Sequence, residues 1–385
     1  MAIVVAPENQ HVIDALPDAL QDEVLQRFAA LMEQANDAQW QRADTQLQLI
    51  NVIAASPFSV QLFLLNPHLL DHDFLTAAFL KDQLQVLLAE TMVKVASETD
   101  LHQCLRQFRK AHQVRLIWRN RCCLGTSQQL VEELSNLADV CVDEALKWLH
   151  NDCVKQWGQP TSHDGKPQEL VVLGMGKLGG RELNLSSDID LIFSFPAGGE
   201  TQGGRRCLDN QQFFIRLGQR LIQAIDVVTA DGFVFRVDMR LRPYGKSGAL
   251  SLSFDAMEIY YQQQGREWER YAFIKARVVA GNQAQGRQLL ELLRPFIYRR
   301  YLDFSAIESL RSLKQMIASE VRRRGLQQNV KLGTGGIREV EFIAQAFQLI
   351  RGGRDIRLRT SSLMVVLNLL PETAGLALAD VERLR

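Results

Sequence analysis

Glycine is distributed unevenly along the chain, and this most constrains the fold. Residues 1–157 contain one glycine, Gly125, whereas residues 158–250 contain fourteen. Glycine weakens a helix interior by roughly 0.5–1 kcal/mol relative to alanine and is favoured in tight turns. The first segment can therefore form long helices, and the second must turn often. We predict an α+β protein with an N-terminal helical region (1–157), a core with a small mixed sheet (158–304) and a C-terminal helical region (305–385).

Apolar periodicity supports this division. Apolar residues recur at helical spacing at Leu20, Val24, Phe28, Leu31 and Met32, and again at Leu130, Leu134, Leu137, Cys141, Ala145 and Leu149. The turn-rich stretch "GQPTSHDGKPQ" (158–168) then predicts the domain boundary. Beyond it we expect strands at "ELVVLGM", "DIDLIFSF" and "GFVFRVDMRLRP". Helices are expected at 208–226 and from about residue 305 onward.

Charge and composition narrow the classes of partner. Lys plus Arg equals Asp plus Glu at 44 each, so the chain has no net field that attracts nucleic acid or anionic lipid. No uncharged apolar run approaches the roughly 20 residues of a membrane span, and the N-terminus lacks a secretory signal. The six cysteines include no CxxC pair. We expect a cytoplasmic protein with neither a nucleic-acid nor a membrane partner.

The stretch "VVLGMGKLGGRELNLSSDIDLIFSF" carries two competing patterns. Its glycines, Gly174, Gly176 and Gly179, match a dinucleotide-binding fingerprint, which requires a full crossover helix before the next strand. Only seven residues separate Gly180 from Asp188, too few for that helix. A phosphate-binding P-loop is excluded as well, because a leucine follows Lys177 where Ser or Thr is required. We therefore reject both interpretations.

The carboxylates of the same stretch form the second pattern. Asp188 and Asp190 stand two apart on the expected strand, so they share one face about 6.6 Å apart. Such a pair repels itself unless cations lie between the two carboxylates, and with one more acid it can hold two Mg²⁺ ions. Asp238 alternates with Arg236 and Arg240 on a later strand, which suits a metal beside phosphates. An ordinary polar strand face with salt bridges is the alternative.

At this point the sequence resembles known proteins. The glycine turn, the paired aspartates and the later third aspartate are similar to the nucleotidyltransferase fold of the DNA polymerase β superfamily. Five longer motifs between about residues 170 and 350 resemble one family, the glutamine synthetase adenylyltransferase/deadenylylases. The motifs are "GMGKLGGRELNLSSDIDLIFSF", "TQGGRR", "DGFVFRVDMRLRPYGKSGALSLS", "QGREWERYAFIKAR" and "KLGTGGIREVEFIAQ".

The resemblance implies an enzyme and a reaction. Family members carry two nucleotidyltransferase units, and this chain looks like the N-terminal, adenylyl-removing one, truncated before the second. That unit performs Mg²⁺-dependent phosphorolysis of adenylyl-tyrosine, taking adenylylated glutamine synthetase and inorganic phosphate to unmodified glutamine synthetase and ADP. This reaction regulates nitrogen assimilation. The resemblance also implies control by the PII signalling protein.

Site residues follow from the motifs. We expect Asp188, Asp190 and Asp238 to be catalytic and to bind two Mg²⁺ ions. Nucleotide or phosphate contacts are expected from Gly179, Gly180, Ser187, Arg240, Arg242 and Lys275, the two glycines through backbone amides at a helix start. For Lys275 and Arg277 a solvated helix face is an equal alternative. Arg338 and Glu341 either order the site or have a structural role.

Other functions stay open at this point. Addition and removal of AMP pass through the same transition state, so the residues alone do not choose the direction. A nucleotidyltransferase of the same fold that modifies another protein, for example by uridylylation of a signalling protein, is a second candidate. A non-catalytic interaction module is the third, because helical flanks make up over half of the predicted chain.

Overall fold

The computed structural model describes residues 5–35, 37–204, 207–299 and 335–384, with single positions between 308 and 329. The chain divides into two compact units. Unit 1 comprises Met1–Cys141 and Val228–Val234, and unit 2 comprises Val142–Val227 and Phe235–Arg385. The predicted boundary at residue 157/158 stays a prediction. The one at 304/305 lies outside the described residues, as does most of the helical pattern predicted just after it.

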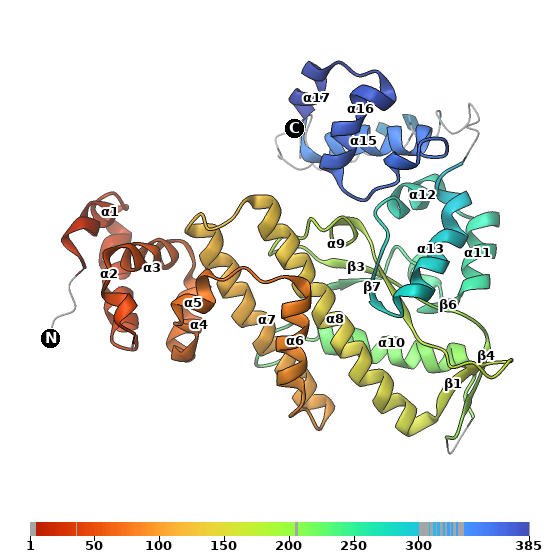
Figure 1. Ribbon diagram of the computed structural model, residues 1–385, viewed down its shortest axis with the longest axis horizontal. Helices are drawn as coiled ribbons and strands as arrows, with labels where there is room; N and C mark the ends of the chain where they lie inside the picture. Colours follow the sequence, from red (N-terminus) through yellow and green to blue (C-terminus); the bar gives the residue numbers. More distant parts are fainter. Residues whose placement is uncertain are drawn as a thin grey trace. The chain divides into compact units, whose positions relative to one another are not determined.

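Unit 1 is helical over its described residues. Its helices (Figure 1) are α1 (Gln10–Asp14), α2 (Asp18–Met32), α3 (Ala43–Ala55), α4 (Pro57–Leu65), α5 (His72–Thr76), α6 (Lys81–Met92), α7 (Glu98–Arg121) and the first part of α8 (Ser127–Trp157), with short 3₁₀ turns at Pro7–Asn9, Ala38–Gln41 and Pro67–Leu69. Ser97 begins α7, since its hydroxyl accepts from the Asp100 amide while the Asp100 carboxylate accepts from the Ser97 amide.

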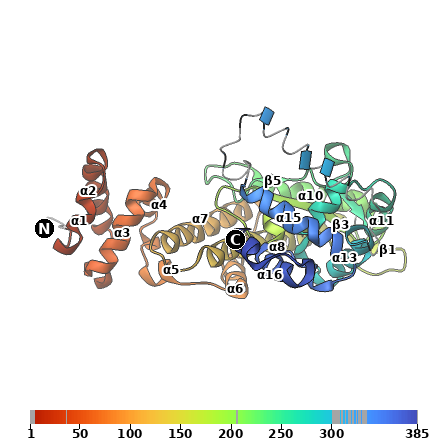
Figure 2. The ribbon, with the colours of Figure 1, turned by 90° about the horizontal axis from the view of Figure 1, so that it is seen from above.

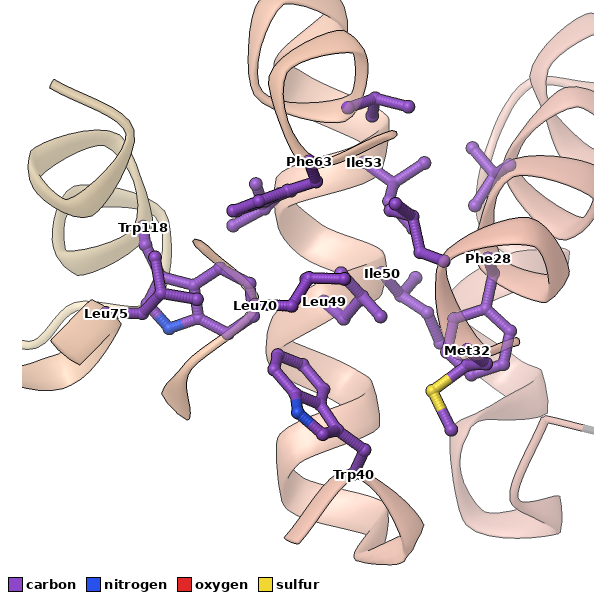
Figure 3. Packing of buried hydrophobic residues seen from close by; sticks show 14 of the residues in the cluster. Phe28, Met32, Trp40, Leu49, Ile50, Ile53, Phe63, Leu70, Leu75 and Trp118 are labelled. Atoms are coloured by element: carbon purple, nitrogen blue, oxygen red, sulfur yellow. The ribbon is translucent and has the colours of Figure 1, made fainter. Parts of the chain in front are cut away.

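An apolar cluster joins these helices. Phe28 and Met32 of α2 point toward Ile50 of α3 (Figure 3). Trp40 and Trp118 meet edge to face with ring centroids 5.8 Å apart. The helical stripes predicted in α2 and α8 are buried as expected. Leu20 is the exception, because it lies in the first turn of α2 and is 37% exposed.

Membrane-spanning character was tested over the described residues. Among them, every single helix is too short or too polar to cross a bilayer, and only α3 and α4 taken together, bent by 114° at their junction, meet the length and composition required. Leu49, Ile53 and Phe63 of that pair are buried in the apolar cluster of unit 1.

Unit 2 contains the strands. They are β1 (Gln159–Ser162), β2 (Val171–Gly174), β3 (Ile189–Phe195), β4 (Gly199–Gln202), β5 (Val237–Asp238), β6 (Ser251–Ser253) and β7 (Arg277–Gly281). β1 and β4 form a separate ribbon, and the other five form a sheet in the order β5-β3-β2-β7, with β6 also paired to β3. β2 is antiparallel to β3 and β7, whereas β3 is parallel to β5 and β6. The predicted small mixed sheet among helices is therefore present.

Besides this sheet, unit 2 contains further helices. They are α9 (Gly176–Gly179), α10 (Asn210–Asp226), α11 (Phe254–Gln263), α12 (Glu267–Phe273), α13 (Gln283–Ile297), α15 (Ile337–Arg351), α16 (Leu363–Ala374) and α17 (Leu378–Leu384), with 3₁₀ turns at Gly245–Ser247 and Ile356–Leu358. On one face Phe214 of α10 stacks on Phe195 of β3 at 4.7 Å. On the other, Leu289 of α13 packs with Leu173 and Ile192. α15 and α16 lie side by side (Figures 1 and 2).

Three predicted elements differ from the structure. The long strand expected at 232–243 is reduced to Val237–Asp238, because the Asp238 carboxylate accepts from the Arg240 amide and turns the chain. The expected linker at 158–168 contains strand β1. The helix expected in "WERYAFIKAR" ends at Phe273, so Lys275 follows it and Arg277 begins β7.

Candidate active site

The strand register brings the three predicted aspartates to one edge of the sheet. Asp190 of β3 stands directly opposite Asp238 of β5 in the parallel ladder. Asp188 precedes β3 by one residue, two positions before Asp190. Side chains two apart on an extended chain share a face, so all three carboxylates belong to the same face. Between them Ile189 is fully buried and anchors the edge, with its amide donating to the Arg236 carbonyl at 2.8 Å.

Arginines neutralise two of these carboxylates. Arg236 Nε lies 2.7 Å from Asp188 Oδ1, and both side chains are at least half exposed. Arg240 donates to both oxygens of Asp238, through its Nε at 3.0 and 2.7 Å. These bonds hold the pKa of the Asp238 carboxyl below its ordinary value. The pKa of Arg240 is raised by Asp238 and also by Asp190 and Asp188, so one guanidinium lies in the field of all three acids.

Asp190 is positioned by the glycine turn after β2. Gly176 has φ of +52°, and a Cβ added there would lie 3.0 Å from Asp190 Oδ2. The Met175 amide donates to the Asp190 carbonyl at 2.9 Å, which fixes the turn against β3. A glycine is therefore required at 176, both for its backbone conformation and for the space that the carboxylate occupies.

We tested whether this edge fits a divalent cation. Within the described parts of the chain, no three Asp, Glu, His or Cys side chains are gathered closely enough to hold a metal ion. The donor set still fits Mg²⁺, which prefers carboxylate oxygens and retains several waters. The exposed ion pair of Arg236 with Asp188 contributes only about 0–1 kcal/mol, so a divalent cation can displace Arg236 at little cost.

Gly179 and Gly180 do not have the role predicted for them. Their amides donate to the Met175 and Gly176 carbonyls, each at 3.0 Å, and both glycines lie at the end of the short helix α9, not at its start. A Cβ on Gly179 would lie 1.9 Å from the Lys275 carbonyl oxygen. These glycines therefore permit close backbone packing, and the prediction that their amides hold phosphate is wrong.

Ser187 lies beside a basic residue that the sequence interpretation passed over. Lys177 Nζ donates to Ser187 Oγ at 3.2 Å, next to Asp188. The sequence pattern presents Lys177 only as a P-loop lysine. Lys177 directly follows Gly176, the glycine that lies against Asp190. This position in the sequence could have indicated that Lys177 lies at the carboxylate edge.

Arg242 braces a loop. Its guanidinium donates to the carbonyls of Met239 at 2.8 Å, Lys246 at 3.2 Å and Gly248 at 3.3 Å. Burial lowers its pKa. Arg242 is thus engaged by backbone carbonyls, whereas the side chain of Arg240 is exposed, and the phosphate contact predicted for Arg240 stays a prediction.

Lys275 is the centre of a buried ion cluster. Its side chain is 5% exposed, and its ammonium lies 2.6 Å from Glu182 Oε2 and also pairs with Glu341. Burial opposes the charge, but Glu341 and Glu182 outweigh it and the pKa of Lys275 is raised. Both carboxylate partners come from the protein itself, which gives Lys275 a structural role, and the predicted nucleotide contact stays a prediction.

A cavity of about 310 Å³ adjoins the carboxylate edge. It shares Gly176 with that edge, since this glycine both lines the cavity and touches Asp190. Among the described residues it is lined by Gly176, Leu241, Trp268, Tyr271, Ala272, Lys275, Arg338, Glu341 and Gln345. A smaller cavity of about 200 Å³ beside α11 and α13 contains none of the predicted site residues.

Comparison with known families identifies the class. Residues 46–292 match the family model described as glutamate-ammonia ligase adenylyltransferase. This match covers more than half of the chain, so the chain belongs to that family, and the resemblance predicted from the motifs is confirmed. Residues 311–384 match the model described as PII-uridylyltransferase.

Individual relatives agree with the family. The chain is 57% identical to a bifunctional glutamine synthetase adenylyltransferase/adenylyl-removing enzyme of Pseudomonas putida over 88% of this chain and 35% of that protein. Identity to the protein of the same name from Pseudomonas aeruginosa is 59%, over 80% and 31%. For the Nitrosococcus oceani protein it is 51%, over 94% and 38%. The chain thus spans about a third of the length of these curated relatives.

Proposed function

We propose that this chain is a Mg²⁺-dependent nucleotidyltransferase that removes AMP from adenylylated glutamine synthetase by phosphorolysis. The observation that carries the proposal is the register of β3 and β5, which sets Asp190 opposite Asp238 with Asp188 on the same edge. Family membership supports nucleotidyl transfer, and the names of the relatives include the removal of adenylyl groups. The sheet around this edge is then a DNA polymerase β-like core in a cytoplasmic enzyme.

Each residue of the edge has a task in this reaction. Asp188, Asp190 and Asp238 would hold two Mg²⁺ ions, which supply positive charge to the phosphoryl and phenolic oxygens. Arg240, displaced from Asp238, turns its planar guanidinium to phosphate oxygens, for which its geometry is suited. Lys177 and Ser187 add donors beside Asp188. The arginines therefore exchange a carboxylate partner for a phosphate partner.

Phosphorolysis would transfer the adenylyl group from the tyrosine oxygen to inorganic phosphate. An oxygen of inorganic phosphate bonds to the adenylyl phosphorus, and the bond from phosphorus to the tyrosine oxygen breaks. The products are ADP and a tyrosine phenolate that takes up a proton from water. Since a phenol has a pKa near 10, the leaving oxygen needs positive charge more than a strong acid.

The substrate and the partners belong to the same proposal. Adenylylated glutamine synthetase, inorganic phosphate and ADP are the reactants and products, and the PII protein is the proposed regulator. The match of residues 311–384 to the PII-uridylyltransferase model supports a link with PII. The same match favours uridylyl transfer to a signalling protein as the second candidate function.

The test is an incubation of the chain with adenylylated glutamine synthetase, Mg²⁺ and phosphate. Phosphate-dependent release of ADP is expected. Release of AMP, or no reaction, would contradict the proposal. Parallel reactions with ATP and unmodified glutamine synthetase, and with UTP and PII, detect the adding direction and the second candidate.

A further inference from the structure

Lys246 is an exposed cation beside the carboxylate edge. Among the described residues, its ammonium forms no ion pair and no hydrogen bond. Other basic side chains of this edge each have a polar partner in the protein, in the pairs Arg236 and Asp188, Arg240 and Asp238, and Lys177 and Ser187. A ligand that binds Lys246 therefore displaces no contact within the protein.

The charge of Lys246 reaches Asp238 although the two side chains are not paired. Hydrogen bonds from Arg240 lower the pKa of the Asp238 carboxyl most, burial opposes them, and the positive charge of Lys246 lowers this pKa further. Attraction between exposed charges is screened beyond about 10 Å at ordinary ionic strength. Lys246 is thus near enough to contact an anion that is bound beside Asp238.

The backbone that carries Lys246 is held in place. Arg242 donates to the carbonyls of Lys246 at 3.2 Å and Gly248 at 3.3 Å. Tyr244 has φ of +60°, which is uncommon for a residue other than glycine, and its ring meets that of Tyr260 with centroids 4.5 Å apart. The loop therefore fixes the start of the Lys246 side chain, while the ammonium can move on its flexible four-carbon stem.

Inorganic phosphate needs such a cation more than the adenylyl phosphate does. The adenylyl group is bonded to its protein, whereas inorganic phosphate enters from solvent and carries more negative charge. The three carboxylates of the edge repel this charge unless cations offset it. Arg240 must leave Asp238 before it can bind phosphate, but Lys246 has no such partner to leave. Lysine is a common phosphate ligand and acts as a point charge.

We propose that Lys246 binds the inorganic phosphate that attacks the adenylyl group, and thus contacts the β-phosphate of the ADP formed. This inference rests on the proposed phosphorolysis and adds a residue that binds the attacking co-substrate. A contact between Lys246 and an acidic side chain of the protein substrate is the alternative that the test detects.

The kinetic test varies inorganic phosphate in the phosphorolysis reaction. Lys246→Gln should raise the KM for phosphate about tenfold, as expected for the loss of a charged hydrogen bond, and change kcat by less than about twofold. Lys246→Arg keeps the charge and should stay within about threefold of the wild-type KM. An unchanged KM for phosphate would overturn the inference. So would a raised KM for adenylylated glutamine synthetase alone, which assigns Lys246 to the protein substrate.

The matched control is Lys166→Gln, because Lys166 is an exposed lysine whose ion pair with Asp164 lies in the loop after β1. It should leave both KM values unchanged. Thermal melts of Lys246→Gln should match those of wild-type protein, since the removed ammonium has no partner among the described residues.

A binding test needs no turnover. Calorimetry with Mg²⁺ present compares ADP, which contains the phosphate in question, with AMP, which lacks it. Lys246→Gln should weaken ADP binding about tenfold and leave AMP binding unchanged. Equal weakening of both nucleotides, no weakening of either, or no binding of ADP to the wild-type chain would overturn the inference.

Failure of the proposed function is distinguishable, since the binding test needs no glutamine synthetase. A chain that releases no ADP in the phosphorolysis test, but uses Lys246 to bind ADP and not AMP, supports the contact with the β-phosphate and contradicts the proposed function. A chain that releases ADP with a KM for phosphate that is independent of Lys246 contradicts only the inference.

Discussion

Unit 2 contains two groups of paired acids and bases that differ in exposure. At the carboxylate edge, the Arg236 and Asp188 side chains are 58% and 50% exposed. In the ion cluster, Lys275 is 5% exposed between Glu182 and Glu341. Exposed pairs contribute about 0–1 kcal/mol, whereas removing one partner of a buried pair costs about 3–5 kcal/mol. The Arg236–Asp188 pair can therefore exchange partners more easily than the Lys275 cluster.

The buried cluster supports the exposed edge. Glu182 follows α9 by three residues, and Glu341 belongs to α15, so Lys275 connects the glycine turn with the C-terminal helices of unit 2. Gly179 packs on the Lys275 carbonyl, and Gly176 packs on Asp190. The ion cluster thus fixes the backbone turn that lies against the Asp190 carboxylate.

The largest effect is expected at the edge. Asp190→Asn removes a carboxylate from the proposed metal site, and loss of several kcal/mol of charge stabilisation lowers the rate about 1,000-fold or more. Phosphorolysis rates and thermal melts are the measurements, and the melting temperature should be nearly unchanged. Asp164→Asn, on an exposed residue of the loop after β1, is the matched control and should keep its rate. Retained activity in Asp190→Asn would exclude this aspartate from the site.

The second-largest effect is expected when Lys275 of the buried ion cluster is replaced. Lys275→Met leaves two carboxylates without their cation and should lower the free energy of unfolding by about 3–5 kcal/mol, measured by urea denaturation. The control is Lys166→Met, whose ion pair with Asp164 is exposed, and which should change stability by less than about 0.5 kcal/mol. If Lys275→Met keeps normal stability but loses nucleotide binding, Lys275 contacts the nucleotide and its role is not structural.

Unit 1 contains a buried titratable group, the His112 ring, beside the buried cation of Arg115. Burial, with Arg115 nearby, lowers the pKa of His112 to about 3. Arg115 Nε donates to His112 Nδ1 at 3.3 Å, so the ring is neutral in the fold. The folded pKa lies below the unfolded value of about 6.5. Acidification below pH 6.5 therefore protonates the unfolded state preferentially, and stability falls by up to about 1.4 kcal/mol per pH unit toward pH 3.

Denaturation of wild-type protein and His112→Gln between pH 7 and 4.5 measures this contribution. The variant should start less stable and lose about 2 kcal/mol less over that range. Parallel curves for the two proteins would mean that His112 titrates normally, and the comparison of buried and exposed charges would not extend to unit 1.

The smallest effect is expected for the exposed pair. Arg236→Gln should change the free energy of unfolding by less than about 1 kcal/mol, since its partner Asp188 remains half exposed to water. Urea denaturation beside wild-type protein checks this value. A loss of 3 kcal/mol or more would show that the edge is as fixed as the buried cluster, and partner exchange would then be excluded.

Local patterns in the sequence predicted a large part of the fold. The apolar runs of β2 and β3 and the stripes of α8, α10 and α15 follow from periodicity, because each element buries its own apolar face. The shared face of Asp188 and Asp190 follows from strand geometry alone. The place of Asp238 followed from alternation along its strand, although the turn at Arg240 ended that strand early.

Contacts distant in sequence could not be predicted in the same way. Lys275 reaches Glu182 across 93 positions, and no local pattern reports a partner so far away. Gly179 looked like a phosphate-binding residue because the motif does not reveal which carbonyls receive its amide or that Lys275 lies against it. The incomplete hydrogen bonding of Gln345 is likewise a property of packing, since Gln348 on the same helix is bonded.

The most direct measurement follows labelled inorganic phosphate into nucleotide. Wild-type chain, Mg²⁺ and adenylylated glutamine synthetase should place the label in ADP, and the folded Asp190→Asn, Asp188→Asn and Asp238→Asn variants should place none there. Unlabelled AMP as the product, or label in ADP from any of these variants at the wild-type rate, would contradict the assignment of the carboxylate edge as the centre of adenylyl removal.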